Sequence, residues 1–109
     1  MANTFKLKTK ANVGVTTVGI YTAPAATTTV VIGITMANTS GSGVNVGVGI
    51  TRAGTTDAVK LLKNAPIPQG SSLEFMSGNK IVLEATDTVV VDSDTNNSVD
   101  AALTIMEIT

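Results

Sequence analysis

The side chains best suited to chemistry are three aspartates near the end of the chain, Asp92, Asp94 and Asp100. Carboxylate oxygens are the ligands that calcium prefers, and aspartates at short spacing are typical of calcium loops. The spacing in "DSDTNNS" (Asp92 to Ser98) matches no complete loop motif, and a solvated acidic turn is the alternative interpretation. We therefore expect no metal site.

The residue types that most enzymes use are missing. The chain has 0 histidines and 0 cysteines, which removes Ser-His-Asp triads, histidine metal ligands and thiolate nucleophiles. The segments "SGSG" and "GVGI" precede neither Lys-Ser/Thr nor a predicted helix, so they are not phosphate-binding loops. We expect no catalytic residue, no cofactor and no enzymatic activity.

Several classes of partner are also disfavoured. A net charge of −1 provides no basic field for nucleic acid. Phe5, Tyr21 and Phe75 are the only aromatic residues, too few for a stacking platform on nucleic acid or glycan. The first ten residues, "MANTFKLKTK", lack the apolar core of a signal peptide, and no apolar run approaches the ~18 residues of a membrane helix. We expect neither nucleic acid nor membrane as a partner.

The elements that carry these residues read as strands. The chain contains 18 threonines, 14 valines and 8 isoleucines, which favour a pleated sheet. Period-two alternation is clear over 30–36, 44–50 and 99–105. We expect an all-β fold: a single antiparallel β-sandwich, jelly-roll-like or immunoglobulin-like, of about eight strands. The glycines of "TSGSG" (39–43) predict a hairpin between two of these strands.

The alternation also predicts which side chains form the core between the two sheets. We expect Phe75 to be prominent among them, because large aromatic side chains dominate core energetics. The predicted set is Val30, Ile32, Ile34, Val46, Val48, Ile50, Leu73, Phe75, Ile81, Leu83, Val89, Val91, Leu103 and Ile105.

The predicted surface is poor in charge. The charged fraction is 14%, against roughly 25% in ordinary soluble domains. A neutral surface of Thr, Ser, Asn, Gly and Ala suits lateral packing against other protein, although a merely threonine-rich domain is the alternative. Gly33, Gly47 and Gly49 lie within predicted strands, where they indicate either close approach of another backbone or local bulges.

The N-terminal segment differs from the rest, and we divide the chain into an extended arm over 1–15 and a β-sandwich domain over 16–109. In "FKLKTK" the lysines Lys6, Lys8 and Lys10 share one side of an extended strand, opposite Phe5 and Leu7. Lysines on an edge strand block edge-to-edge aggregation. The other interpretation is that these five residues form an interface, docking the arm by strand addition on a neighbouring subunit or on the underlying shell. Deletion of 1–12 would then leave a folded domain.

Five segments together resemble a known group of proteins. They are "YTAPAATT" (21–28), "ANTSGS" (37–42), "PIPQGSSLEF" (66–75), "IVLEATDTVVV" (81–91) and "MEIT" (106–109). In this order they resemble small virion structural proteins of tailed bacteriophages, β-sandwich proteins that decorate or cement capsids or belong to the tail. Each proline of "PIP" fixes φ and removes a donor, so we expect this element to carry the chain from one sheet to the other.

The resemblance covers about Val18 to Thr109 and leaves the arm outside. It implies a non-enzymatic structural component of a phage particle, most specifically a capsid decoration or cement protein, assembled in the host cytoplasm and located in the virion. The implied partners are the protein itself, as a trimer or dimer, and the major capsid protein or other virion proteins. The alternatives are a tail, baseplate or fibre-attachment protein and, from another class, a receptor- or glycan-binding module.

Overall fold

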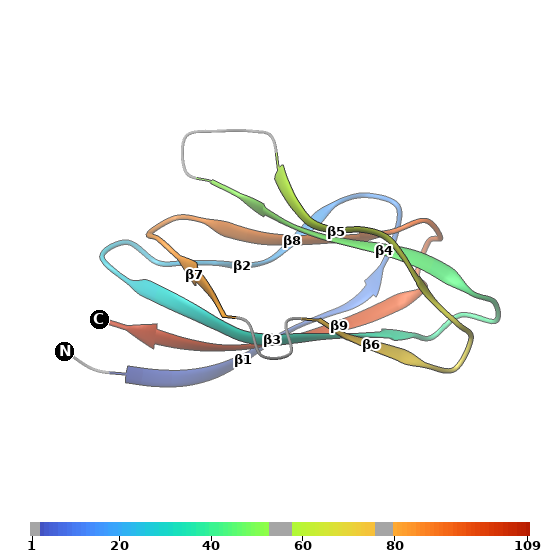
Figure 1. Ribbon diagram of the computed structural model, residues 1–109, viewed down its shortest axis with the longest axis horizontal. Helices are drawn as coiled ribbons and strands as arrows, with labels where there is room; N and C mark the ends of the chain where they lie inside the picture. The colour runs from blue at the N-terminus through green and yellow to red at the C-terminus, as the bar shows by residue number, and fades with distance from the viewer. Residues whose placement is uncertain (1–2, 53–57, 76–79) are drawn as a thin grey trace.

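Two antiparallel sheets pack face to face in the computed structural model, which describes residues 3–52, 58–75 and 80–109 (Figure 1). All the described elements are strands, and none of the described residues belongs to a helix that could span a membrane. The larger sheet contains β1 (Asn3–Val13), β3 (Thr28–Asn38), β6 (Ser72–Phe75), β7 (Ile81–Leu83) and β9 (Val99–Ile108). The smaller sheet contains β2 (Val18–Thr22), β4 (Val44–Thr51), β5 (Ala58–Ile67) and β8 (Thr88–Ser93).

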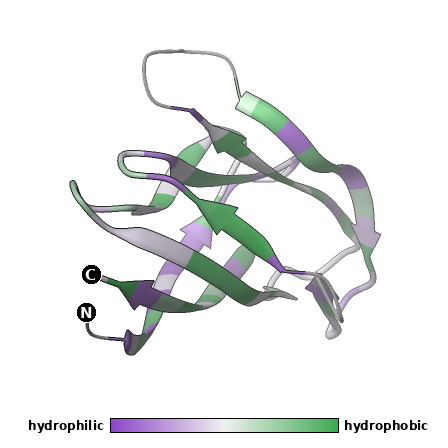
Figure 2. Cartoon of the chain, turned by 60° about the vertical axis from the view of Figure 1, so that its left-hand side comes forward, coloured by the Kyte–Doolittle hydropathy of each residue, from purple (hydrophilic) through white to green (hydrophobic). Residues whose placement is uncertain are grey.

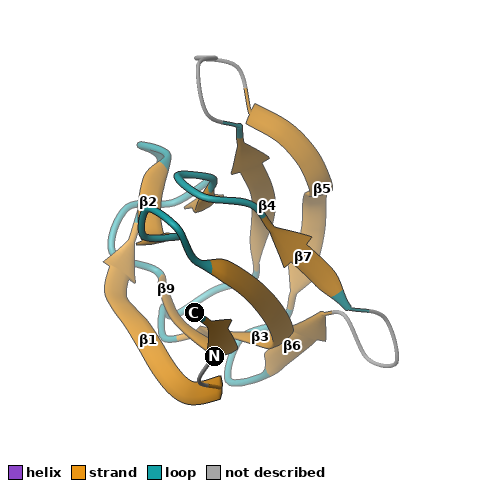
Figure 3. Cartoon of the chain, turned by 90° about the vertical axis from the view of Figure 1, so that its left-hand side faces the viewer, coloured by secondary structure: helices purple, strands orange, loops and turns teal. Residues whose placement is uncertain are grey.

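The pairing of the strands is nested, as in a long hairpin rolled into two layers. β1 pairs with β9, β2 with β8, β3 with β6 and β7, and β4 with β5. Further pairing of β3 with β9 and of β4 with β8 closes each sheet. The two layers are visible end-on in Figure 3. The predicted antiparallel sandwich is confirmed, and the nested order is that of a jelly roll.

The connection over 39–43 is not the predicted hairpin. It leads from β3 in the larger sheet to β4 in the smaller one, so the strands that it joins do not pair. The buried Asn38 shapes this corner: its Nδ2 donates to the carbonyl oxygens of Ser42 at 2.8 Å and Ile67 at 2.9 Å. Matching alternation in two segments indicates two strands, but it does not show that they are neighbours.

The "PIP" element crosses between the sheets, as predicted. β5 ends at Ile67 in the smaller sheet, and β6 begins at Ser72 in the larger one. Ile67 is buried in the core, while the flanking prolines are exposed. Gly70 has a φ of 74°, a conformation that glycine adopts without steric cost, so the turn into β6 needs this residue.

The core contains most of the predicted set, but a β-bulge changes one strand. In β3 the register with β9 shifts between Val31 and Gly33. Val31 is therefore buried, whereas Val30 and Ile32, predicted to be buried, are half-exposed. Leu73 and Ile81 pack partly buried against the core, and the side chain of Phe75 lies outside the described part of the structure. The predicted residues found buried are Ile34, Val46, Val48, Ile50, Leu83, Val89, Val91, Leu103 and Ile105.

The N-terminal residues do not form an arm that stands apart from the sandwich. Residues 3–13 are β1, the edge strand of the larger sheet, and they pair with β9 of the same chain (Figure 1). The two ends of the chain lie side by side, with Asn3 opposite Ile108. Hydrophobic and hydrophilic bands alternate along β1 (Figure 2). The backbone N–H and C=O groups of β1 form hydrogen bonds with the edge of β9 in the same chain. This pairing explains why the segment is part of the sandwich and not the expected separate arm.

Of the three glycines noted within strands, Gly47 and Gly49 are required by contacts inside this chain. A Cβ on Gly47 would lie 2.6 Å from Asp92 Oδ1, and one on Gly49 would lie 2.9 Å from the carbonyl oxygen of Val59. Both are buried and permit the close approach of neighbouring strands. Gly33 is different, because an added Cβ meets nothing within 4 Å.

Candidate functional site

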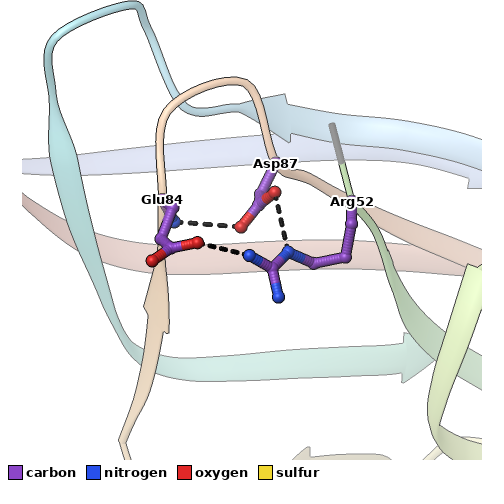
Figure 4. Close-up of polar contacts among 3 residues, drawn as sticks. All are labelled: Arg52, Glu84 and Asp87. Carbon is purple, nitrogen blue, oxygen red and sulfur yellow. Dashed lines mark hydrogen bonds and ion pairs between the residues drawn. The ribbon is translucent and has the colours of Figure 1, made fainter. Parts of the chain in front are cut away.

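The polar cluster of Arg52, Glu84 and Asp87 stabilises a corner of the fold (Figure 4). The guanidinium of Arg52, just after β4, donates to Asp87 Oδ1 at 3.0 Å and forms an ion pair with Glu84. Asp87 is buried, and its Oδ2 accepts from the Glu84 backbone N–H at 3.0 Å. These contacts close the turn between β7 and β8. Each carboxylate is committed to a structural hydrogen bond, an arrangement that offers no general acid or base.

A second polar network lies in the core between the sheets. The phenol of Tyr21 on β2 donates to Glu107 Oε2 on β9 at 2.6 Å and lies 2.8 Å from the hydroxyl of Thr29 on β3. Lys6 Nζ on β1 reaches Glu107 Oε1 at 2.9 Å. Burial, followed by the hydrogen bond to Glu107, raises the pKa of Tyr21 to about 12. The hydrogen bond from Tyr21, followed by that from Lys6, lowers the pKa of Glu107.

The polar groups of this network are fully hydrogen-bonded, and their protonation states do not suit catalysis. Among the described residues, no buried side-chain nitrogen or oxygen lacks a hydrogen-bond partner. The shifted pKa values leave the phenol neutral and the carboxylate charged at neutral pH, and neither state favours proton transfer. We assign the network to stability.

The acidic residues that could have bound calcium do not converge. Asp94 Oδ1 accepts from the Asn45 backbone N–H at 3.1 Å, and Asp100 Oδ1 accepts from that of Asn12 at 2.9 Å. Asp92 Oδ2 accepts from the Thr17 hydroxyl at 3.0 Å. Over residues 3–52, 58–75 and 80–109, no group of three or more acidic side chains could hold a metal ion.

The five predicted interface residues divide between the two faces of the larger sheet. Lys6, Lys8 and Lys10 lie opposite Ile105, Leu103 and Ala101, so the lysines share the core-facing side of β1. Phe5 and Leu7 lie opposite Met106 and Thr104 on the outer face, and they are 69% and 64% exposed. Inward-pointing charges on an edge strand prevent pairing with further strands. The geometry thus favours contact through the outer face over strand addition at the edge.

A row of apolar side chains crosses this outer face. Phe5 is paired with Met106, Met106 with Val30, and Val30 with Val82, so four adjacent strands contribute to it. Phe5 and Val82 are largely exposed, and the two central side chains are half-exposed. We call these four residues the apolar row. The sequence indicated only its first member, because the others depend on the cross-strand register.

A shallow hollow lies on the same face, further along the strands. It has a volume of about 330 Å³. Small residues of three strands line it: Thr9 and Ala11 of β1, Ala102 of β9, and Thr35 and Ala37 of β3. Lys10, Asp100 and Ala101 line it as well. The outer face therefore has a raised end, formed by the apolar row, and a recessed end, formed by the hollow.

The outer face is also nearly free of charge. Among the described outward-facing residues of the larger sheet, the ionisable ones are Asp100 on β9 and Glu74 on β6, which pairs with Thr35, and both lie at the recessed end. The outer side of the smaller sheet instead carries Lys60 and Asp92, whose Nζ and Oδ2 atoms are 3.8 Å apart. Depletion of charge and exposure of apolar side chains are typical of the centre of a protein–protein interface.

Comparison with known proteins gives likenesses in structure alone. No protein-family model matches the chain, and no curated protein matches it in sequence. A chain from the disulfide-linked pili that form Bacillus endospore appendages is 16% identical, with a TM-score of 0.59 over 99% of this chain and 87% of that chain. A chain from the acid-stable capsid of Helicobacter pylori bacteriophage KHP30 is 10% identical, with a TM-score of 0.55 over 100% of this chain and 89% of that chain. At these identities the likeness shows the shared fold.

Proposed function

We propose that this protein is a non-enzymatic structural component of a phage particle, most specifically a capsid decoration or cement protein. The observation that carries the proposal is the charge-poor outer face of the larger sheet, with Phe5 exposed at its raised end and Leu7 exposed beside it. A face of this kind stabilises an assembly by lateral contact, because burying it removes apolar area from water and desolvates few charges.

The structural likenesses support a role in assembly. One neighbour is part of a capsid and the other part of a pilus. This chain has 0 cysteines, so the disulfide linkage named for the pili is not open to it, whereas non-covalent contact is. The proposed partners are further copies of the protein itself and the major capsid protein or other virion proteins. It is assembled in the host cytoplasm and carried in the virion.

A second candidate is a tail, baseplate or fibre-attachment protein. The likeness to a pilus subunit favours it, because a similar fold there forms an appendage. A receptor- or glycan-binding module has less support. Of the aromatic side chains that the structure describes, Tyr21 is buried and Phe5 is exposed on the outer face of the larger sheet, so they form no aromatic platform.

Co-sedimentation with purified phage particles tests the proposal. The wild-type chain is expected to sediment with particles stripped of it, and Phe5→Ala combined with Leu7→Ala is expected to weaken binding by at least about tenfold, as loss of a central apolar contact does. Val59→Ala is the matched control, because Val59 is also an exposed apolar residue but lies on β5 of the smaller sheet. Failure of the wild-type chain to sediment with the particles would contradict the proposal.

A further inference from the structure

We propose that the outer face of the larger sheet binds a second copy of this chain, in a face-to-face dimer with a two-fold axis. The axis runs across the strands, over the row formed by Leu7, Thr104 and Gly33. The inference rests on the proposed function in taking this face as an assembly surface, and it adds which partner covers the face and in what orientation.

The placement of the raised and recessed ends supports this symmetry. The apolar row begins at Phe5, and the row through the hollow begins at Thr9, where Thr9 is paired with Ala102 and Ala102 with Thr35. Leu7 lies midway between the two rows on β1. A two-fold rotation about the Leu7 row therefore places the apolar row of each copy over the hollow of the other.

The contacts that result join large side chains to small ones. Phe5 would lie over Thr9 of the partner subunit, Met106 over Ala102 of the partner subunit, and Val30 over Thr35 of the partner subunit. Each pair occurs twice, as an isologous interface requires. Alternation of large and small side chains across facing sheets is how the two layers of a β-sandwich interdigitate.

The size of the face fits a stable dimer. β1 and β3 each have 11 residues. With a rise of about 3.4 Å per residue and about 4.8 Å between strands, four adjacent strands offer a face of roughly 700 Å². A standard interface buries about 800 Å² on each partner. The ionisable residues of this face are Asp100, near the start of β9, and Glu74, on the edge strand β6, so both lie toward its margins and the row on the axis contains no charge.

Gly33 provides a sharp test, because it lies on the proposed axis. An added side chain there meets nothing within 4 Å, and the backbone is not in the left-handed region. Gly33→Lys should therefore leave the single chain folded while placing two like charges opposite each other in the dimer. Gly41→Lys is the matched control: it also meets nothing within 4 Å, but it lies in the loop between the sheets.

Light scattering and sedimentation equilibrium of the purified chain over the micromolar range measure the effect. We expect the wild-type chain and Gly41→Lys to be dimers, and Gly33→Lys to self-associate at least about a hundredfold more weakly. A monomeric wild-type chain, an oligomer not built of dimers, or a dimer unaffected by Gly33→Lys would each overturn the inference. Circular dichroism verifies that Gly33→Lys is folded.

Cross-linking supplies a second measurement that does not depend on Gly33. Because the chain has 0 cysteines, Thr104→Cys introduces a single thiol on the axis. A short bis-maleimide should join two copies of Thr104→Cys, whereas Gly41→Cys should remain uncross-linked. Absence of cross-linking in Thr104→Cys would overturn the face-to-face arrangement. Particle binding tests the proposed function separately, since a monomer that sediments with particles refutes only the dimer.

Discussion

Tyr21 and Glu107 join the two sheets through a hydrogen bond of 2.6 Å between phenol and carboxylate. Tyr21 belongs to β2 of the smaller sheet and Glu107 to β9 of the larger sheet. Both side chains are buried, and Lys6 on the edge strand β1 forms an ion pair with the carboxylate of Glu107. The network therefore ties β1 to the rest of the sandwich as well as one sheet to the other.

The titration of Tyr21 reports directly on this contact. The chain has 1 tyrosine and 0 tryptophans, so absorbance in the tyrosinate band follows one group. We expect a midpoint of about 12, because burial and the neighbouring carboxylate disfavour the phenolate. The raised pKa contributes stability that is complete below the unfolded value of about 10 and is lost as pH rises toward the folded value. A midpoint near the unfolded value in the folded protein would contradict the buried contact.

Acid should weaken the same network by protonating Glu107. The folded pKa of Glu107 is depressed by its hydrogen bonds from Tyr21 and Lys6. Its contribution is therefore complete above the unfolded value of about 4.3 and is lost as pH falls through the folded value. Urea unfolding between neutral pH and pH of about 3 should show this loss. Glu107→Gln should flatten the decline and Lys6→Met should reduce it, whereas an unchanged slope in Glu107→Gln would contradict the assignment.

The bulge in β3 predicts opposite behaviour for two adjacent valines. Val31→Ala removes a side chain that is 2% exposed and should lower the free energy of unfolding by about 1–3 kcal/mol. Val30→Ala, on the outer face, should cost about 0.5 kcal/mol or less. Denaturant unfolding of the two variants measures both values. The reverse order would mean that β3 has the register predicted from simple alternation.

The sequence permitted the fold class to be predicted because the alternation and the turn residues are local signals. The crossover at "PIP" could also be predicted, since proline fixes φ and glycine permits a positive φ wherever they occur. The bulge at Ile32 and Gly33 has no such local signature, so the predicted positions of Val30 and Ile32 were wrong. The hairpin at 39–43 failed for a related reason, because strand neighbours are decided by long-range pairing.

The same distinction applies to the candidate site. The division of the N-terminal strand into Phe5 and Leu7 on one side and lysines on the other follows from local alternation, and the register with β9 agrees with it. Met106, Val30 and Val82 could not have been added to Phe5 from the sequence alone. They join it only through the pairings of β1 with β9, β9 with β3, and β3 with β7.

Removal of residues 1–12 is now expected to destabilise the chain strongly. The deletion would expose the backbone edge of β9 and remove Lys6 from the buried Glu107. We expect a large fall in the midpoint of thermal unfolding, or loss of the folded state, in circular dichroism. A truncated chain with wild-type stability would show that β1 is dispensable for folding. Point substitutions on the outer face are therefore the better probes of assembly.

Cryo-electron microscopy of the intact phage particle tests the central proposal most directly. Density for this jelly roll on the capsid shell, in contact with the major capsid protein, is the result that a decoration or cement protein predicts. Particles whose shell lacks this density, or which carry it only in the tail, would contradict that role.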